Sequence, residues 1–576
     1  MHKTVVRRSA REALEDINHL HPVLRQVYAR RDLDSTQELA SSLEKLLPYD
    51  DLSGIGQAVD LLMRALEHQQ RILVVADFDA DGATSCAVAI RALRMLGAQQ
   101  VDYLVPNRFE FGYGLTPEIV DVAVTRRPDL IITVDNGIAS ASGVRRAHEF
   151  GISVLITDHH LPPDELPEAD AIVNPNLHGD PFASKHLAGV GVIFYVMLAL
   201  RAALRRQGRF RSSPEPNLAC LLDLVALGTV ADVVKLDHNN RILVAQGLSR
   251  IRRGKASAGI AALIAVSGRN PSRLAAADLG FALGPRLNAA GRLEDMSLGI
   301  ACLLSDSLDD ALPLAGRLDE LNHERRQIEA DMKQQALTQL ALDDFAGEIA
   351  TLPYGLCIYH ENWHQGVIGI LAARLKERVH RPVIAFAPAG EGELKGSARS
   401  VPGLHIRDAL DSVARRHPGL LNKFGGHAMA AGLSLPLAHY EEFSRAFDRE
   451  VRVHLDADDL RGVIYSDGEL PADDFAIEVA ELLRFAGPWG QGFPEPVFDG
   501  HFIVRSLRIV GEVHLKLQLQ PARSAAAVDA ILFHGANGKL PAEGDTVHVA
   551  FRLDVNEYLG RRQLQLVVEH MAPVGR

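Results

Sequence analysis

Between residues 71 and 175, short apolar runs alternate with amphipathic helical segments, and this alternation constrains the fold more than any other feature. Apolar runs bounded by turn residues predict buried strands, and the segments between them keep the three- and four-residue spacing of helices. Parallel strands need such crossover connections, so the pattern predicts a parallel sheet with helices on both faces. The expected strands lie within residues 71–78, 101–107, 130–137, 152–160 and 171–175.

The chain has 576 residues, too many for one hydrophobic core, and its pattern changes along its length. A mostly helical region is expected to end in a long, partly exposed helix that joins two lobes. Strands alternate with turn residues near the C-terminus and predict a small β-barrel. The fold class is therefore α/β, and the expected segments are an N-terminal helical segment (1–50), a parallel-sheet domain (51–240), a helical region with the connecting helix (241–345), a second α/β domain (346–455) and a barrel domain (456–576).

Composition excludes several classes of protein. The N-terminus lacks the unbroken apolar core of a signal peptide, and the most apolar window, residues 187–200, is too short to span a membrane. The four cysteines lie far apart without metal-knuckle spacing, which favours reduced thiols and a cytoplasmic location. A net charge of −12 argues against a general polyanion binder, although a local basic groove can still bind nucleic acid.

Acidic and histidine side chains follow three of the predicted strands. Ligands bind outside the carboxyl ends of parallel strands, so we expect these side chains at one edge of the sheet. A further apolar segment, residues 221–234, contributes two more carboxylates. The resulting set is Asp77, Asp79 and Asp81 after the first strand, Asp135 after the third, Asp158, His159 and His160 after the fourth, and Asp223 and Asp232 from the later segment.

Carboxylates at this density repel one another unless a cation lies among them. Oxygen and imidazole ligands without thiolate favour Mn²⁺ or Mg²⁺, and the number of carboxylates favours two ions. Gly82 and the helix behind it are expected to offer backbone N–H groups to a phosphate. A lone Asp after a strand is more often a turn or helix cap, and DxDxDG also begins calcium loops. The calcium loop fails here because Val88 stands where its Glu is required.

Several motifs resemble the DHH phosphoesterase superfamily and its companion DHHA1 domain. The first domain contains "DFDADG", "VDNG", "TDHH" and "ALGTVADVV" in that order, and the second contains "KGSARS" and "FGGHAMAAGL". The segments "GPRLNAAGRL" and "WGQGFPEPVF", with the long helix and the barrel, are similar to the superfamily branch of bacterial 5′→3′ exonucleases specific for single-stranded DNA. The resemblance implies a two-metal phosphodiesterase of DNA repair and recombination that releases 5′-mononucleotides.

The resemblance also implies roles for the clustered residues. Asp158 would orient a histidine, and His160 would face the scissile phosphate; with Asp79 and Asp135 they form the expected catalytic set. Asp77 is expected beside the site, as an outer residue or an occasional ligand. Many superfamily members carry a histidine where Val75 stands, which affects the surroundings of the second metal. The implied metal ligands are Asp79, Asp81, Asp135, His159 and Asp232, with Asp135 as the bridge.

Substrate contacts are implied in the same way. Arg108 and Tyr113 match residues used for phosphate contact and base stacking, and the barrel resembles an OB-fold that extends a single-strand track. A pocket for the 5′-terminal phosphate would use Ser397 and Arg399 with Arg286 or Arg292, and His427 in a glycine-rich motif would contact phosphate. Solvated surface arginines and, for the glycine-rich motif, a tight helix-start packing site are the alternatives.

Two other functions stay open from the sequence. The same metal edge occurs in pyrophosphatases and in hydrolases of short oligoribonucleotides or cyclic dinucleotides, but these are typically shorter and lack the barrel. A metal-free replication scaffold is the non-enzymatic alternative, and the presence of every matching ligand argues against it. The expected partners are single-stranded DNA with a 5′ end, and also a single-strand-binding protein and a helicase, with the chain acting as a monomer away from membranes.

Overall fold

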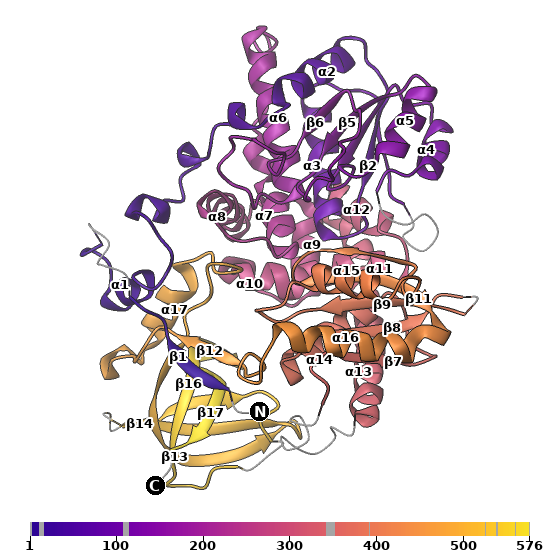
Figure 1. Cartoon of the computed structure of the whole chain (residues 1–576). Coiled ribbons are helices and arrows are strands. Elements are labelled where there is room, and N and C mark those ends of the chain that lie inside the picture. The colour runs from indigo at the N-terminus through magenta and orange to yellow at the C-terminus, as the bar shows by residue number, and fades with distance from the viewer. Residues whose placement is uncertain are drawn as a thin grey trace.

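Three five-stranded β-sheets and a smaller two-stranded sheet organise the chain in the computed structural model that Figure 1 shows. It describes residues 3–10, 17–106, 114–340, 352–390, 392–522, 524, 526–536, 540–558 and 560–574. The first sheet and its helices form one lobe, the second sheet forms another, and the third closes into a barrel. The predicted α/β class with a parallel-sheet domain, a second α/β domain and a terminal barrel is confirmed.

The first sheet is wholly parallel and has the strand order β3-β2-β4-β5-β6. Its two faces bury separate apolar cores, because alternate residues of each strand point to opposite sides. Helices α3 and α6 cover one face, and α4 and α5 cover the other. The elements are α2 (Ile55–Glu67), β2 (Ile72–Ala76), α3 (Ala80–Met95), β3 (Val101–Leu104), α4 (Pro117–Val124), β4 (Leu130–Val134), α5 (Ala141–Glu149), β5 (Ser153–Thr157), β6 (Ala171–Val173) and α6 (Gly189–Arg206).

A helical region then connects the lobes. Its last helix, α13 (Leu308–Gln339), is the long connecting helix expected from the sequence. Leu318 and Leu321 of α13 belong to the core of the first lobe, and Met332 and Leu337 belong to a core of the second. None of the helices in the described part of the chain is both long and apolar enough to cross a membrane. The preceding helices are α7 (Leu222–Ala231), α8 (His238–Arg252), α9 (Ala258–Val266), α10 (Ala276–Asp278), the π-helix η6 (Leu279–Leu283), α11 (Gly284–Leu293) and α12 (Ser297–Leu304).

The second sheet is mixed and has the order β10-β11-β9-β8-β7. Helix α14 packs on one face with the distal part of α13, while α15 and α16 pack on the other. The glycine-rich motif forms the hairpin of β10 and β11. The alternative interpretation of this motif as a tight helix start is therefore wrong. The elements are β7 (Leu356–Tyr359), α14 (Ile368–Val379), β8 (Val383–Pro388), β9 (Glu393–Arg399), α15 (Ile406–Arg416), β10 (Lys423–Gly426), β11 (Ala430–Pro436) and α16 (Tyr440–His454).

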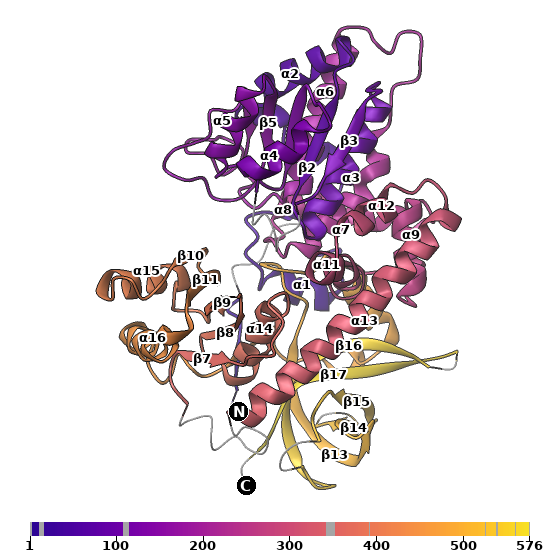
Figure 2. The same cartoon turned by 90° about the vertical axis from the view of Figure 1, so that its right-hand side faces the viewer.

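The C-terminal sheet is a closed five-stranded barrel in the order β13-β14-β15-β17-β16. Most of its pairs are antiparallel, but β15 and β17 run parallel, which closes the barrel without an open edge. The barrel lies on the side of the molecule away from the first sheet (Figures 1 and 2). Its elements are α17 (Ile477–Phe485), β13 (Phe498–Val510), β14 (His514–Pro521), β15 (Val528–Leu532), β16 (Thr546–Tyr558) and β17 (Arg561–Pro573).

The N-terminal segment crosses to the barrel side of the molecule. It contains α1 (Pro22–Tyr28), but it begins with a strand, β1 (Thr4–Arg7), that pairs in parallel with β12 (Val463–Ser466). A strand in this segment was not expected, because its partner lies more than 450 residues away in the sequence. Arg31, which is 4% exposed, donates two hydrogen bonds to the fully buried Asp467, at 2.5 and 3.1 Å.

We expect Asp467→Ala to detach this segment. The substitution leaves the buried Arg31 without its charge partner, which costs about 3–5 kcal/mol of unfolding free energy. Limited proteolysis should then cleave the N-terminal segment faster, and the temperature of the first thermal unfolding transition should fall. Glu469→Ala is the matched control because Glu469 binds Arg7 at the exposed surface, where a pair contributes about 1 kcal/mol or less. Equal behaviour of the two variants would contradict this assignment.

Candidate metal centre and nucleic-acid site

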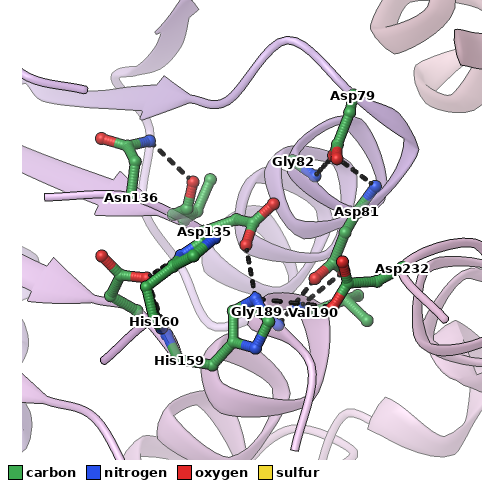
Figure 3. Close-up of polar contacts among 12 residues, drawn as sticks. Asp79, Asp81, Gly82, Asp135, Asn136, His159, His160, Gly189, Val190 and Asp232 are labelled. Carbon is green, nitrogen blue, oxygen red and sulfur yellow. Dashed lines mark hydrogen bonds and ion pairs between the residues drawn. The ribbon is translucent and has the colours of Figure 1, made fainter. Parts of the chain in front are cut away.

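The predicted acidic and histidine residues meet at the carboxyl edge of the first sheet. Strands β2, β4 and β5 are neighbours in the sheet, and Asp232 reaches the same place from the end of α7. Figure 3 shows Asp135, His159 and Asp232 pointing toward one another. Three overlapping groups have ligand atoms within 4.8 Å of each other: Asp81, His159 and Asp232; Asp77, Asp79 and Asp135; and Asp135, His159 and His160.

Backbone N–H groups hold the side chains of Asp79 and Asp81 in place. Both oxygens of Asp81 accept hydrogen bonds at the start of α6, from the backbone N–H of Gly189 at 2.7 Å and of Val190 at 3.0 Å. Asp79 caps α3, and its Oδ1 accepts from the backbone N–H of Asp81 and Gly82. The helix-cap interpretation therefore holds for one oxygen of Asp79, which also belongs to a group that could hold a metal.

The expected phosphate site at the N-terminus of α3 is wrong. Asp79 takes the N–H groups of Asp81 and Gly82 through its side chain and that of Ala83 through its carbonyl. The N–H of Ala80 donates to Oδ1 of Asn288 on α11 at 2.8 Å. These N–H groups are satisfied within the protein and are not available to bind a phosphate.

Asp135 adopts an unusual backbone conformation at the centre of the cluster. Its φ of 62° lies in the left-handed region, which costs a non-glycine residue about 1 kcal/mol or more. Gly189 makes room for the side chain, because a Cβ at Gly189 would lie 2.7 Å from both Cβ and Oδ1 of Asp135. Burial, followed by the charges of Asp81, Asp79 and their neighbours, raises the pKa of Asp135 well above its usual value.

Two side-chain atoms in the cluster show that its donors suit a cation. Nε2 of His159 and Oδ2 of Asp232 are buried, lie 3.5 Å apart, and accept or donate no hydrogen bond within the described ranges. Burial and the nearby charge of His160 lower the pKa of His159 to about 3, so its imidazole is neutral at physiological pH. Burial and the charge of Asp79 raise the pKa of Asp232 to about 7. A cation satisfies the neutral imidazole and the crowded carboxylates together, so the donor set fits Mn²⁺ or Mg²⁺.

Asp158 fixes the neighbouring His160. Its carboxylate accepts backbone N–H groups from Ile138, His159 and His160, and Nδ1 of His160 lies 2.7 Å from its Oδ1. Burial disfavours the charged form of His160, but the hydrogen bond and charge of Asp158 outweigh it and raise the pKa of His160 to about 9. His160 is therefore a positioned cation at the rim of the cluster.

Three asparagines that sequence reasoning missed hold the strand ends. Asn136 is buried and donates to the carbonyls of Val75 and Val134, which ties β2 to β4. Asn174 and Asn176 follow β6 and donate to the carbonyls of His160 and His159. The position of "NPN" directly after a predicted strand was the available signal, because polar residues there face the same edge.

The second lobe faces this cluster. His427, in the turn between β10 and β11, stacks on His160 with ring centroids 6.1 Å apart. Ser397 and Arg399 share the face of β9 that is covered by α14, and Nη1 of Arg399 donates to Oγ of Ser397 at 3.0 Å. Burial lowers the pKa of Arg399, and no carboxylate in the described part of the chain forms an ion pair with it.

The structure separates the two arginines of α11. Arg286 is buried, forms an ion pair with Asp319 of α13 at 2.8 Å and donates to the carbonyl of Ala282. It joins α11 to α13 and is unsuited to a phosphate contact. Arg292 lies at the junction with the second lobe, where Nη1 donates to the carbonyl of Gly366 at 3.1 Å.

Some predicted residues lie elsewhere. Asp223 is buried outside the cluster and accepts a hydrogen bond from the backbone N–H of Ser257. Val75, at the position of the superfamily histidine, is buried in the core beneath α4 and α5. Arg108 and Tyr113 lie outside the described residues.

Comparison with known proteins identifies the family. Residues 71–229 match the DHH family, N-terminal domain, residues 350–452 match the DHHA1 domain, and residues 466–570 match the RecJ OB domain. The single-stranded-DNA-specific exonuclease RecJ of Escherichia coli is 54% identical over 571 residues, which is 99% of each chain. This chain belongs to the RecJ family.

Solved RecJ structures carry the same architecture. RecJ of Thermus thermophilus in complex with Mn²⁺ has a TM-score of 0.78 and 30% identity, covering 96% of this chain and 76% of that one. The Mg²⁺ complex of the same RecJ has a TM-score of 0.73 and 28% identity, with coverage of 97% and 76%. The RecJ fold therefore extends over nearly the whole chain.

We expect Gly189→Ala to displace Asp135. The new methyl group would overlap the side chain of Asp135, and such overpacking costs about 1–3 kcal/mol. Calorimetric titration with Mn²⁺ should show affinity weakened about tenfold or more. Gly316→Ala on α13 is the matched control, because a Cβ there meets nothing within 4 Å and alanine favours the helix. If Gly189→Ala binds Mn²⁺ like the parent chain, Asp135 is not confined as described.

Proposed function

We propose that this chain is a metal-dependent exonuclease that hydrolyses single-stranded DNA from its 5′ end and releases 5′-mononucleotides, in DNA repair and recombination. The observation that carries the proposal is the buried cluster in which Nε2 of His159 and Oδ2 of Asp232 make no hydrogen bond with the described residues, next to His160, which contacts His427 of the second lobe. The 54% identity to the E. coli exonuclease over 99% of both chains supports the substrate.

The proposal places two ions, Mn²⁺ or Mg²⁺, in the cluster. Asp79, Asp81, Asp135, His159 and Asp232 would hold them, with Asp77 beside them. When bound, these ions would neutralise phosphate charge and lower the pKa of an attacking water. The solved Mn²⁺ and Mg²⁺ complexes of T. thermophilus RecJ support this choice of metals.

The protein's own donors would orient the scissile phosphate. His160, charged because Asp158 raises its pKa, would donate a hydrogen bond to a phosphate oxygen and stabilise negative charge as the bond breaks. His427 stacks on His160 from the opposite lobe and would contact the same strand. Both histidines would therefore hold one strand between the lobes.

The 5′→3′ direction of hydrolysis would come from recognition of the 5′-terminal phosphate. Arg399 is partly buried, lacks a carboxylate partner in the described chain and lies beside the hydroxyl of Ser397. A guanidinium in this state favours a bidentate contact with phosphate. Selectivity for single strands would be steric, because lobes this close leave no room for a duplex. The chain would act as a monomer on strands presented by a helicase and coated by a single-strand-binding protein.

Asp79→Asn is expected to lower the hydrolysis rate about 100-fold or more, because several kcal/mol of charge stabilisation are lost. The amide oxygen can still accept the two backbone hydrogen bonds that cap α3, so the fold and the affinity for single-stranded DNA should be retained. Fluorescence anisotropy and hydrolysis of labelled strands measure the two effects. Asp237→Asn, at the cap of α8, is the matched control.

The substrate panel compares 5′- and 3′-labelled single strands with blunt duplex DNA, short RNA and a cyclic dinucleotide, each with Mn²⁺ or Mg²⁺. The proposal requires that 5′-labelled single strands release labelled mononucleotide first. Efficient attack on blunt duplex, release from the 3′ end, or full activity of Asp79→Asn would overturn it.

Arg399→Ala should reduce the preference for a 5′-phosphate over a 5′-hydroxyl end about tenfold or more, because a charge-assisted hydrogen bond contributes about 1.5–3 kcal/mol. The ratio of kcat/KM for the two substrates measures the change. Arg445→Ala is the control, since Arg445 is exposed on α16, on the opposite face of the second sheet. An unchanged ratio would exclude Arg399 from the terminal-phosphate site.

A further inference from the structure

A basic groove is lined by residues of α11, α13 and α14, three helices that lie side by side in Figure 2, next to the proposed terminal-phosphate site. Its volume is about 530 Å³, which is within the range of small-molecule sites. Its cationic lining residues are Arg292, Arg325, Arg326, Lys333 and Arg374, and its one carboxylate is Glu329.

The groove carries a local excess of positive charge in a chain whose net charge is −12. Glu329 is already shared, because Arg325 donates to it at 2.6 Å and Arg374 at 3.1 Å. Arg326 and Lys333 form no ion pair with any carboxylate in the chain as described. The unbalanced charge attracts an anion.

Arg325 is buried and repelled by the neighbouring cations of the groove. Its side chain is 8% exposed, and its Nε is buried without a hydrogen-bond partner within the described residues. Burial, together with the charges of Arg326 and Arg374, lowers the pKa of Arg325 despite the opposing effect of Glu329. An anion in the groove would relieve this repulsion.

Phe281 gives the groove an apolar side. Its side chain is 77% exposed, the most exposed of the large hydrophobic residues in the described chain. Pro285 and Ile370 also line the groove, and an exposed aromatic ring such as that of Phe281 is suited to stack with a planar base. Cations beside an exposed ring match a ligand that combines phosphate with a base.

The groove shares a wall with the proposed terminal-phosphate residues. A Cβ at Gly369, in the first turn of α14, would lie 2.9 Å from Nη2 of Arg399 and 3.0 Å from Oγ of Ser397. The next residue, Ile370, lines the groove, and Arg292 at its mouth holds the loop before α14. The groove therefore begins one residue along α14 from the position that contacts Arg399 and Ser397.

We propose that this groove binds a nucleoside 5′-monophosphate, with its phosphate among Arg326, Lys333 and Arg374 and its base against Phe281. The choice of this ligand rests on the proposed function, because it is the product of that reaction. The site would receive the released nucleotide and keep it out of the path of the next one.

The test is equilibrium binding of thymidine 5′-monophosphate to the full chain in EDTA, which removes binding through a metal. Arg326→Glu/Lys333→Glu should weaken this affinity about tenfold or more, since both charges are reversed. Arg206→Glu/Lys255→Glu removes the same charges from exposed positions elsewhere and should leave it unchanged. Thermal unfolding of both variants checks that each is folded.

Thymidine and inorganic phosphate are the comparison ligands, and both should bind more weakly than the nucleotide. Equal loss in the two double variants, no loss in the groove variant, or equally tight binding of inorganic phosphate would overturn the proposal. So would a groove variant that loses affinity for single-stranded DNA and keeps it for the nucleotide. The titration needs no hydrolysis, so an inactive chain would refute the proposed function and leave this result standing.

Discussion

Mutual repulsion among buried carboxylates at the carboxyl edge of the first sheet is the constraint on which the site depends. Neighbouring parallel strands end at one edge, so their terminal aspartates cannot avoid one another. The fold holds them with backbone N–H groups, two for Asp81 from the start of α6 and two for the capping oxygen of Asp79. Gly189 at the start of α6 also leaves space for Asp135. These contacts position the carboxylates without neutralising them, and a bound cation would relieve the repulsion that contributes to the raised pKa of Asp135 and of Asp232.

Much of this arrangement was predictable because it follows from local rules. Strand–helix alternation determines a parallel sheet, and a parallel sheet places Asp135 and His159 at the same edge as Asp81. The long connecting helix was also predictable from its spacing of apolar residues. The motifs were sufficient to predict the family, because they occur in order over almost the whole chain.

The contacts that were not predictable are tertiary. Arg286 and Arg292 look alike in the sequence, and only the position of α13 shows that Asp319 neutralises the first. The N-terminus of α3 was expected to bind phosphate, but Asn288 on a distant helix and the Asp79 cap satisfy its N–H groups. Strand β1 was missed because a strand is defined by its partner, and that partner is β12 at the far end of the chain.

Because the N–H groups at the N-terminus of α3 are satisfied, they cannot offset the negative charge of the cluster. Among the described residues, the first lobe presents mainly carboxylates in the cluster, with His160 as a positioned cation at its rim. A phosphodiester brought to that edge is repelled unless positive charge comes from bound metal and from across the cleft. Under the proposed function the second lobe would supply that charge through Arg399, which forms no ion pair with a carboxylate in the described chain, while His427 stacks on His160. Helix α13 packs into the cores of both lobes, so it would hold the carboxylate cluster and Arg399 at a set separation.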